Sequence, residues 1–152
     1  MRTSTPPTSE TGFTLVELMI VLAIAGIAAT AVVLSLPNPA ATVRDDAQRF
    51  AVRLNAARDA AVIRGQAMQV VVSPSGYAFA RRERAGWQPL DDKPFVTTDW
   101  RDGASALVGQ MGRIRLVFDA AGVPSEAANV TLVRNEVRVN VALGLDGKVV
   151  VQ

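Results

Sequence analysis

The longest apolar stretch of the chain runs from Gly12 to Leu36 and reads GFTLVELMIVLAIAGIAATAVVLSL. From Phe13 onward its about 24 residues are apolar or small, with a single charged side chain, Glu17. At 1.5 Å per residue such a helix is about 36 Å long, enough to cross a hydrocarbon core of about 30 Å with some tilt. No polar stripe is present for contact with solvent. We therefore predict a helix over 13–36 that is surrounded by lipid, by other copies of itself, or by both.

A second helical pattern follows the sequence Pro37-Asn38-Pro39, where we expect a break because proline removes an amide donor and clashes with the preceding turn. Asn38 is expected to cap the new helix, with Pro39 in its first position. Apolar residues then recur at spacings of three and four, at Val43, Ala47, Phe50, Leu54, Ala57 and Ala61. The pattern predicts an amphipathic helix over 37–65 that ends at Gly65.

From residue 66 to the C-terminus the period changes to two, which is typical of strands. The predicted strands and hairpins are 68–72 with 76–81, 95–98, 113–119, 130–133 with 137–141 about Asn135, and 149–152 after an Asp146-Gly147 turn. The stretch 99–111 is the least regular. The predicted fold class is therefore α+β: a long N-terminal helix, of which the second half packs on a head of antiparallel β-sheets, with one of two sheets covered by that helix.

Glu17 is the anomaly within the apolar stretch. A carboxylate inside a membrane costs about 2.5 to 3.5 kcal/mol on insertion scales, and the stretch contains no cation to pair with it. Cleavage just before Phe13 would create an α-amino group four residues away. That amine could pair with Glu17 within one helix or with Glu17 of a neighbouring subunit, in which case it would set the stagger between subunits.

The residues Gly12-Phe13-Thr14-Leu15-Val16-Glu17 resemble the processing site of the type IV pilin superfamily. The resemblance implies that residues 1–12 are a leader, that prepilin peptidase cuts between Gly12 and Phe13, and that Phe13 becomes a methylated N-terminus. It also gives Glu17 a role in subunit assembly. The leader carries Arg2 but no basic residue directly before Gly12, where many prepilins have one, and this difference concerns processing efficiency.

Two other readings of the apolar stretch stay open on the sequence alone. A secretory signal peptide could be cut at Ala29-Thr30-Ala31, although its apolar core is usually about 7 to 15 residues and carries no acid. A plain single-span anchor with an incidental Glu17 is the other. The prepilin reading accounts for more of the residues than either.

The resemblance narrows in the second helix and in the predicted head. The segment Phe50-Ala51-Val52-Arg53-Leu54-Asn55-Ala56-Ala57-Arg58-Asp59-Ala60-Ala61, together with Gly76-Tyr77, Phe79, Trp87, Asp91-Asp92, Trp100, the 114–122 strand and turn, and Gly147, is similar to the H-type minor pseudopilins, the GspH/FimT group. This implies a low-copy structural subunit at or near the tip of the pseudopilus in type II secretion, spanning the bacterial inner membrane once, with a periplasmic head over 66–152. The implied partners are other major and minor pseudopilins, prepilin peptidase, the inner-membrane assembly platform and membrane lipid.

Composition excludes several kinds of chemistry. The chain has no Cys and no His, which removes Ser/His and Cys/His nucleophilic sites and the commonest metal ligand. The neighbouring pairs Asp45-Asp46 and Asp91-Asp92 are interpreted as helix surface and turn, because adjacent side chains diverge. A calcium site formed by Asp91, Asp92, Asp99 and Asp102 is the less favoured alternative to solvated loop acids. We expect no enzyme activity, no catalytic residue, no metal and no cofactor.

An alternative function concerns Arg113 and Arg115, which lie on the polar face of a predicted strand, with Arg138 as a candidate neighbour. Some pilins of the same group serve type IV pili and capture DNA, and exposed arginines can bind phosphates. With a net charge of +2, the chain falls short of a nucleic-acid-binding composition. A solvated sheet face is therefore favoured over DNA contact. Tyr77, Phe79, Trp87 and Trp100 are expected in a core or interface.

Overall fold

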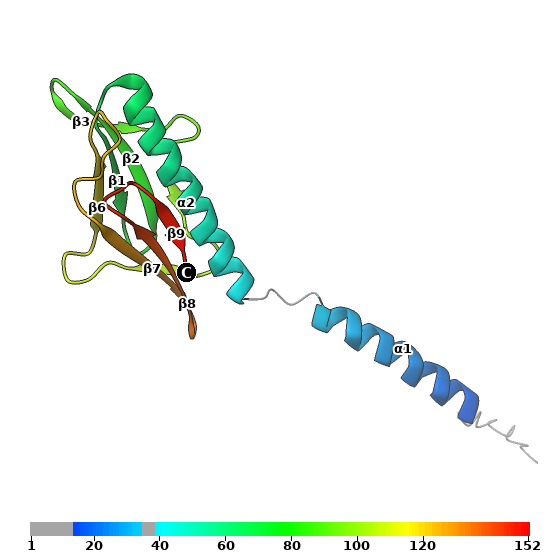
Figure 1. Ribbon diagram of the computed structural model, residues 1–152. Coiled ribbons are helices and arrows are strands. Elements are labelled where there is room, and N and C mark those ends of the chain that lie inside the picture. The colour runs from blue at the N-terminus through cyan, green and yellow to red at the C-terminus, as the bar shows by residue number, and fades with distance from the viewer. Residues whose placement is uncertain (1–13, 35–38) are drawn as a thin grey trace, which may run out of the picture. The chain divides into compact units, whose positions relative to one another are not determined.

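The computed structural model describes residues 14–34 and 39–152 (Figure 1). Its elements are α1 Leu15–Leu34, α2 Pro39–Arg64, β1 Met68–Val72, β2 Gly76–Glu83, β3 Gly86–Leu90, β4 Thr98–Asp99, β5 Ser105–Leu107, β6 Ile114–Phe118, β7 Ala128–Arg134, β8 Val137–Leu143 and β9 Val149–Val151. α1 and the part that begins with α2, here called the head, are separate compact units. α2 begins at Pro39 as predicted. The leader, Phe13, the cap at Asn38 and the expected break at residues 37–38 lie outside the described residues.

The strands form two antiparallel sheets, as the period-two pattern predicts (Figure 1). Sheet A has the order β3-β2-β1-β6, with β4 also paired to β2, and sheet B has the order β5-β7-β8-β9. The predicted hairpins are confirmed, because β1 pairs with β2, β7 with β8 and β8 with β9. Strand β5 was not predicted, since it is only three residues long and lies in the irregular stretch 99–111.

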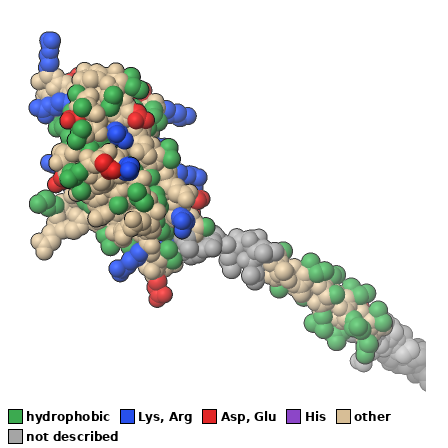
Figure 2. All heavy atoms as spheres, in the orientation of Figure 1, with side chains coloured by type: hydrophobic (Ala, Val, Ile, Leu, Met, Phe, Trp, Pro, Cys, Tyr) green, Lys and Arg blue, Asp and Glu red, His purple; other side chains and the backbone are tan. Residues whose placement is uncertain are grey.

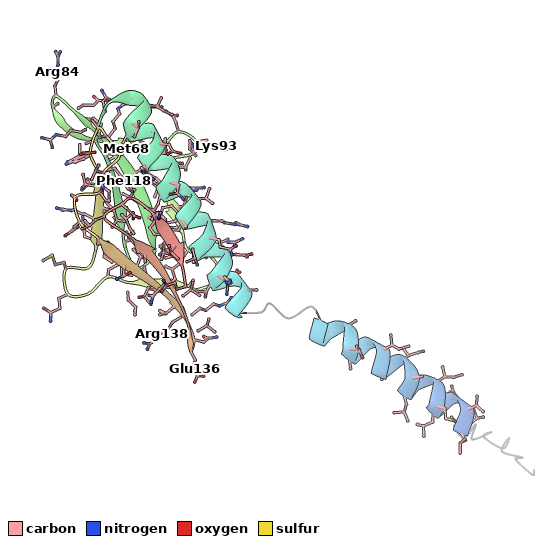
Figure 3. The ribbon with its side chains drawn as sticks, in the orientation of Figure 1. Met68, Arg84, Lys93, Phe118, Glu136 and Arg138 are labelled. Carbon is pink, nitrogen blue, oxygen red and sulfur yellow. The ribbon has the colours of Figure 1, made fainter. Side chains whose placement is uncertain are left out.

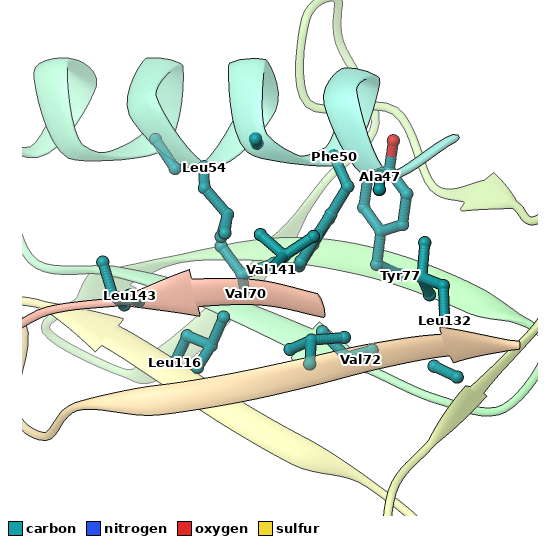
Figure 4. Close-up of a cluster of buried hydrophobic side chains, with 14 of the residues drawn as sticks. Ala47, Phe50, Leu54, Val70, Val72, Tyr77, Leu116, Leu132, Val141 and Leu143 are labelled. Atoms are coloured by element: carbon teal, nitrogen blue, oxygen red, sulfur yellow. The ribbon is translucent and has the colours of Figure 1, made fainter. Parts of the chain in front are cut away.

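One face of α2 is buried against strands of both sheets, among them β1 of sheet A and β8 of sheet B. The expectation that the helix covers a single sheet is therefore wrong. The buried positions are those that recur at helical spacing: Val43, Ala47, Phe50, Leu54, Ala57 and Ala61. Figure 4 shows Phe50 and Leu54 pointing from α2 toward Val70 of β1 and Val141 of β8, which belong to sheet A and sheet B, respectively. The side chains of the helix and of both sheets form one hydrophobic core.

The C-terminal end of α2 is closed by Gly65, as predicted. Gly65 has φ of 60° and donates its N–H to the carbonyl of Val62 at 3.2 Å. The next amide, of Gln66, donates to the carbonyl of Ala61 at 3.1 Å. This is the Schellman arrangement, in which a left-handed residue satisfies the last carbonyls of a helix. It turns the chain directly into β1.

The β8–β9 hairpin has the predicted Asp146-Gly147 turn. Gly147 has φ of 75°, which glycine adopts without steric cost. The N–H of Lys148 donates to Asp146 Oδ1 at 3.0 Å. This backbone hydrogen bond lowers the pKa of the Asp146 carboxyl below its ordinary value. The positive φ of Gly147 and the hydrogen bond accepted by the Asp146 side chain therefore both stabilise this turn.

A tight backbone contact positions β4 on β2. A Cβ atom on Gly76 would lie 2.3 Å from the carbonyl oxygen of Thr98 and 2.9 Å from Cα of Asp99. The predicted strand 95–98 is wrong except at Thr98. Phe95 instead follows a turn in which its N–H donates to the carbonyl of Asp92 at 2.6 Å, and its buried ring lies 5.4 Å from that of Phe79. Burial of the ring, rather than a strand ladder, holds this segment.

Aromatic rings link α2 to sheet A. The ring centroid of Phe50 lies 4.9 Å from that of Tyr77 and 5.5 Å from that of Trp100, and both pairs are inclined. Burial raises the pKa of the Tyr77 phenol above its ordinary value. Tyr77, Phe79 and Trp100 are buried as expected, whereas Trp87 on β3 is only half-buried.

A charged pair joins the N-terminal half of α2 to the loop after β4. Asp46 is only 5% exposed, and its carboxylate accepts two hydrogen bonds of 2.8 Å, from the backbone N–H and from Nε of Arg101. The surface interpretation of Asp45-Asp46 is therefore wrong for Asp46, because Arg101 compensates its burial. It holds for Asp45, which lies 4.0 Å from Nη2 of Arg101 and is 60% exposed.

We predict that Gly76→Ala destabilises the head by about 1 to 3 kcal/mol, because the new methyl group would collide with backbone atoms of β4 rather than with a movable side chain. Urea unfolding of the head measures this. Ser75→Ala is the neighbouring control, since it removes only an exposed hydroxyl group and its solvent-exposed hydrogen bond to the Ser73 hydroxyl, and we expect a change within about 0.5 kcal/mol. Equal stability of Gly76→Ala and wild type would contradict the tight approach of β4.

We predict that Asp46→Asn lowers the free energy of unfolding by about 1 to 3 kcal/mol, because a charge-assisted acceptor for two Arg101 donors is lost. The range is kept modest since the Arg101 side chain is 40% exposed and solvent screens it. Asp45→Asn should change stability by no more than about 0.5 kcal/mol. Thermal or urea unfolding of both variants checks the pair, and similar losses at the two positions would contradict the assignment.

Candidate assembly surfaces

α1 exposes apolar side chains on all of its faces. Leu15, Ile20, Ile24 and Ile27 are all more than half exposed, and Ile27 reaches 72%. Figure 2 shows hydrophobic side chains along the visible face of this helix, in contrast to the mixed surface of the head. Leu15–Val32 is long and apolar enough to cross a membrane and lies near the N-terminus. In water such a surface would be unfavourable, so it requires lipid or protein around it.

The first turn of α1 carries the one acid of this helix. The N–H of Glu17 donates to Oγ1 of Thr14 at 3.2 Å, so Thr14 caps the helix N-terminus. Glu17 thereby occupies the third helical position, where the helix dipole favours a negative charge. Within 14–34 and 39–152 no cation lies within ion-pair distance of its carboxylate. Gly12 and Phe13, the predicted cleavage and methylation residues, lie outside the described residues.

A groove of about 420 Å³ runs between α2 and the β4 region, next to the Asp46–Arg101 pair. Arg53 lies in it with a fixed orientation: Nη1 donates to the carbonyl of Val96 at 3.1 Å and to Oγ1 of Thr98 at 2.5 Å. Its guanidinium also lies 5.7 Å from the Tyr77 ring centre, a cation–π distance. The hydrogen bond to Asp46 raises the pKa of the Arg101 guanidinium above its ordinary value.

Arg113 and Arg115 are both exposed, as the period-two pattern predicts for the polar face of this strand. Arg115 lies in β6 opposite Val71 of β1, and Leu116 and Phe118 on the other face are buried. Arg138 belongs to β8 of sheet B, and Figure 3 places it near the β7–β8 tip. The expected triplet of arginines therefore divides between two sheets.

The acids of the loops do not assemble into a metal site in the part of the chain that the structure describes, where no three Asp or Glu side chains gather. Asp91, Asp92, Asp99 and Asp102 are each exposed. Asp46, the one buried acid among the described residues, is neutralised by Arg101.

The sequence does not indicate that Asp46 pairs with Arg101, or that Arg53 bonds Val96 and Thr98. The paired residues are separated by 55 positions in one case and by 43 and 45 in the other. The spacing does place both residues beside the buried face of α2, because Asp46 comes three residues after Val43 and four before Phe50, and Arg53 comes three residues after Phe50. Only the fold of the β4 loop over the helix makes them neighbours.

Comparisons with known proteins agree with this architecture. A family model described as "Type II transport protein GspH" matches residues 46–147, more than half of the 152-residue chain. A second model, the prokaryotic N-terminal methylation motif, matches residues 8–33. No curated protein matches the chain.

Two solved structures of the minor pseudopilin EpsH from the type II secretion system of Vibrio cholerae are similar to it. One is 18% identical with a TM-score of 0.59 and covers 72% of this chain and 95% of that chain. The other is 17% identical with a TM-score of 0.58 and covers 76% and 98%, respectively. At these identities the likeness shows the fold, while the family match carries membership. The chain therefore belongs to the GspH family of type II transport proteins, and it has the fold of a minor pseudopilin.

Proposed function

We propose that this GspH-family protein, a minor pseudopilin of the type II secretion system, is a structural subunit at or near the tip of the periplasmic pseudopilus. In this role α1 anchors the chain in the inner membrane and packs among the helices of other pseudopilins. The head lies in the periplasm and contacts further subunits. The observation that carries the proposal is the GspH match over 46–147 in a chain whose segment Leu15–Val32 is a helix long and apolar enough to cross a membrane. The same match favours type II secretion over DNA uptake by a pilus.

Maturation supplies a positive partner for Glu17, which has none among residues 14–34 and 39–152. Prepilin peptidase cuts between Gly12 and Phe13, and the methylated amine of Phe13 then lies at the membrane depth of the acid. The N-terminal methylation motif that matches 8–33 supports this step. An amine in the same subunit or in a neighbour can reach the carboxylate, and the second geometry fixes the axial register of adjacent helices. A paired charge then replaces an isolated one in the apolar interior of the helix bundle.

We expect the mature protein to begin with methylated Phe13, which mass spectrometry of the protein purified from membranes measures. Gly12→Leu should retain the leader, because a bulky side chain replaces the small residue before the cut. Gly26→Ala is the control: a Cβ atom there meets nothing within 4 Å, so processing should proceed unchanged. An N-terminus at Met1, or one beyond Ala31, in the wild-type protein would overturn the proposed maturation.

We expect Glu17→Ala to leave membrane insertion intact and to lower incorporation into pseudopili at least about threefold, since polar pairs within membranes contribute about 0.6 to 2 kcal/mol. Quantitative blotting of sheared pseudopili against membranes measures both. Glu10→Ala, in the leader, is the control and should assemble normally.

Glu17→Gln distinguishes pairing from helix capping. Glutamine keeps the size and can take part in a capping box with Thr14, yet it carries no charge. If the acid pairs with an amine, Glu17→Gln fails like Glu17→Ala. Normal assembly of Glu17→Gln would instead assign the residue a role in the helix start alone.

A further inference from the structure

Strand β6 lies at one end of sheet A, with β1 on one side only. The C-terminal half of its other edge is covered by the chain that follows it. There the N–H of Ser125 donates to the carbonyl of Val117 at 2.9 Å, and the N–H of Asp119 donates to the carbonyl of Val123 at 2.9 Å. The N-terminal half of the edge, residues 113–116, has no such cover from the described residues.

The backbone pattern of β1 shows which groups of β6 point outward. Ser73 and Gly76 exchange hydrogen bonds of 2.8 and 3.4 Å at the start of the β1–β2 hairpin, so the odd positions of β1 bond β2. The even positions, which pair with Ile114 and Leu116, therefore bond β6. Arg115 lies between these two residues, so its N–H and carbonyl point in the plane of the sheet toward the open edge, away from β1. Nothing in ranges 14–34 and 39–152 bonds these two groups.

The side chains at this open edge are basic and are accompanied by an exposed apolar residue. Arg113 and Arg115 make no ion pair with the described acids. They line a hollow of about 450 Å³ together with Met111, which is 89% exposed. Unpaired edge groups are a template for another strand, and the charges select which strand can approach.

A second copy of this chain does not suit the edge. Two β6 edges that pair antiparallel around a two-fold axis bring outward-facing positions opposite one another, which places Arg113 or Arg115 against Arg115 of the other copy. Like charges directly opposite across strands are destabilising. The occupant must therefore be a different chain with acidic residues.

We propose that an extended acidic segment of another pseudopilin adds to sheet A as an antiparallel strand along residues 113–116, bonding the backbone of Arg115. This inference rests on the proposed function, which supplies other pseudopilins as neighbours. Because side chains alternate across a strand, the added segment has acids two positions apart, opposite Arg113 and Arg115. The residue between them is apolar and lies beside Ile114, which is half-buried on the inner face.

Cysteine cross-linking in the assembled system tests the proposal, since the chain has no native Cys. Full-length Arg113→Cys, labelled in its own cells with a maleimide–benzophenone, should form an adduct with another pseudopilin on irradiation. The maleimide takes the introduced thiol, and the excited benzophenone inserts into a C–H bond of the neighbouring segment, so the partner needs no cysteine. The cross-linked peptide of the partner should carry the spaced acids. Arg84→Cys at the β2–β3 turn, which Figure 3 shows pointing away from the head, is the control and should form no such adduct. An adduct between two copies of this chain, or no adduct from position 113, would overturn the proposal.

Arg115→Pro separates backbone pairing from charge. Proline removes an N–H that faces solvent in the head, a position that edge strands tolerate, so the head should still fold. We expect the adduct from position 113 to fall at least about tenfold, because backbone hydrogen bonds to the added strand are lost. Arg115→Thr keeps the N–H and a good strand former, so the adduct should fall no more than about fivefold. Equal yields from Arg115→Pro and wild type would refute strand addition.

Charge reversal keeps the proposal testable should the proline variant unfold. Arg115→Glu should abolish the adduct, and an acid-to-arginine change in the cross-linked partner segment should restore it. Failure of that restoration would count against the pairing. Salt-dependent binding of duplex DNA that disappears in Arg113→Ala/Arg115→Ala, with no adduct to a pseudopilin, would assign the edge to nucleic acid instead.

A cysteine in α1 separates this proposal from the proposed function. Leu22 is well exposed on that helix, so Leu22→Cys should cross-link to other pseudopilins whenever the chain is part of a pseudopilus. Adducts from position 22 but none from position 113 would refute only the strand addition. Absence of adducts from both positions would refute membership of the filament as well.

Discussion

The head depends on the burial of one face of α2 against both of its sheets. Phe50 and Leu54 are almost fully buried, and they meet side chains of β1 from sheet A and of β8 from sheet B. Neither sheet could bury its inner face without the helix, because a sheet that is apolar on one side needs a covering layer. The helix is thus part of the core of the head, and a force applied along it would be transmitted to both sheets.

The helix face and most hairpins could be predicted because their signals are local. The three-and-four spacing from Val43 to Ala61 and the Asp146-Gly147 turn each lie within one element or one turn, where side-chain period and backbone preference decide the outcome. The errors fall where distant segments meet. The sequence pattern predicts Phe95 in a strand, yet the free energy gained by burying its ring against Phe79 outweighs its strand preference. Asp46 reads as surface, because its partner Arg101 comes from a loop that no periodicity describes.

The two parts of the chain meet opposite constraints on charge. In the head, the buried Asp46 has a cation from the same chain, so its cost is met within one subunit. In α1, Glu17 has the favourable field of the helix N-terminus but no countercharge in the described residues. The acid in the apolar stretch stands out in the sequence, whereas Asp46 is missed because its partner Arg101 lies 55 residues away in a loop. An acid without a countercharge in an apolar helix therefore indicates a partner in another subunit, whereas the Asp46–Arg101 pair only stabilises its own head.

The same reasoning applies to the open edge of β6. Natural sheets protect exposed edges with charge, and Arg113 and Arg115 place two positive charges at this one. Protection alone, however, does not explain why only half of this edge is covered by the chain's own segment 123–125. Protection also does not explain the exposed side chain of Met111, which adds apolar surface to the hollow, whereas a residue that only prevents edge pairing would be polar. This edge disfavours pairing with a second copy of the same strand. It offers free backbone groups, positive charge and an apolar contact, which together suit an acidic strand from a different subunit. Such selectivity would let a low-copy subunit occupy a defined place in an assembly of related chains, because identical heads cannot pair through this edge.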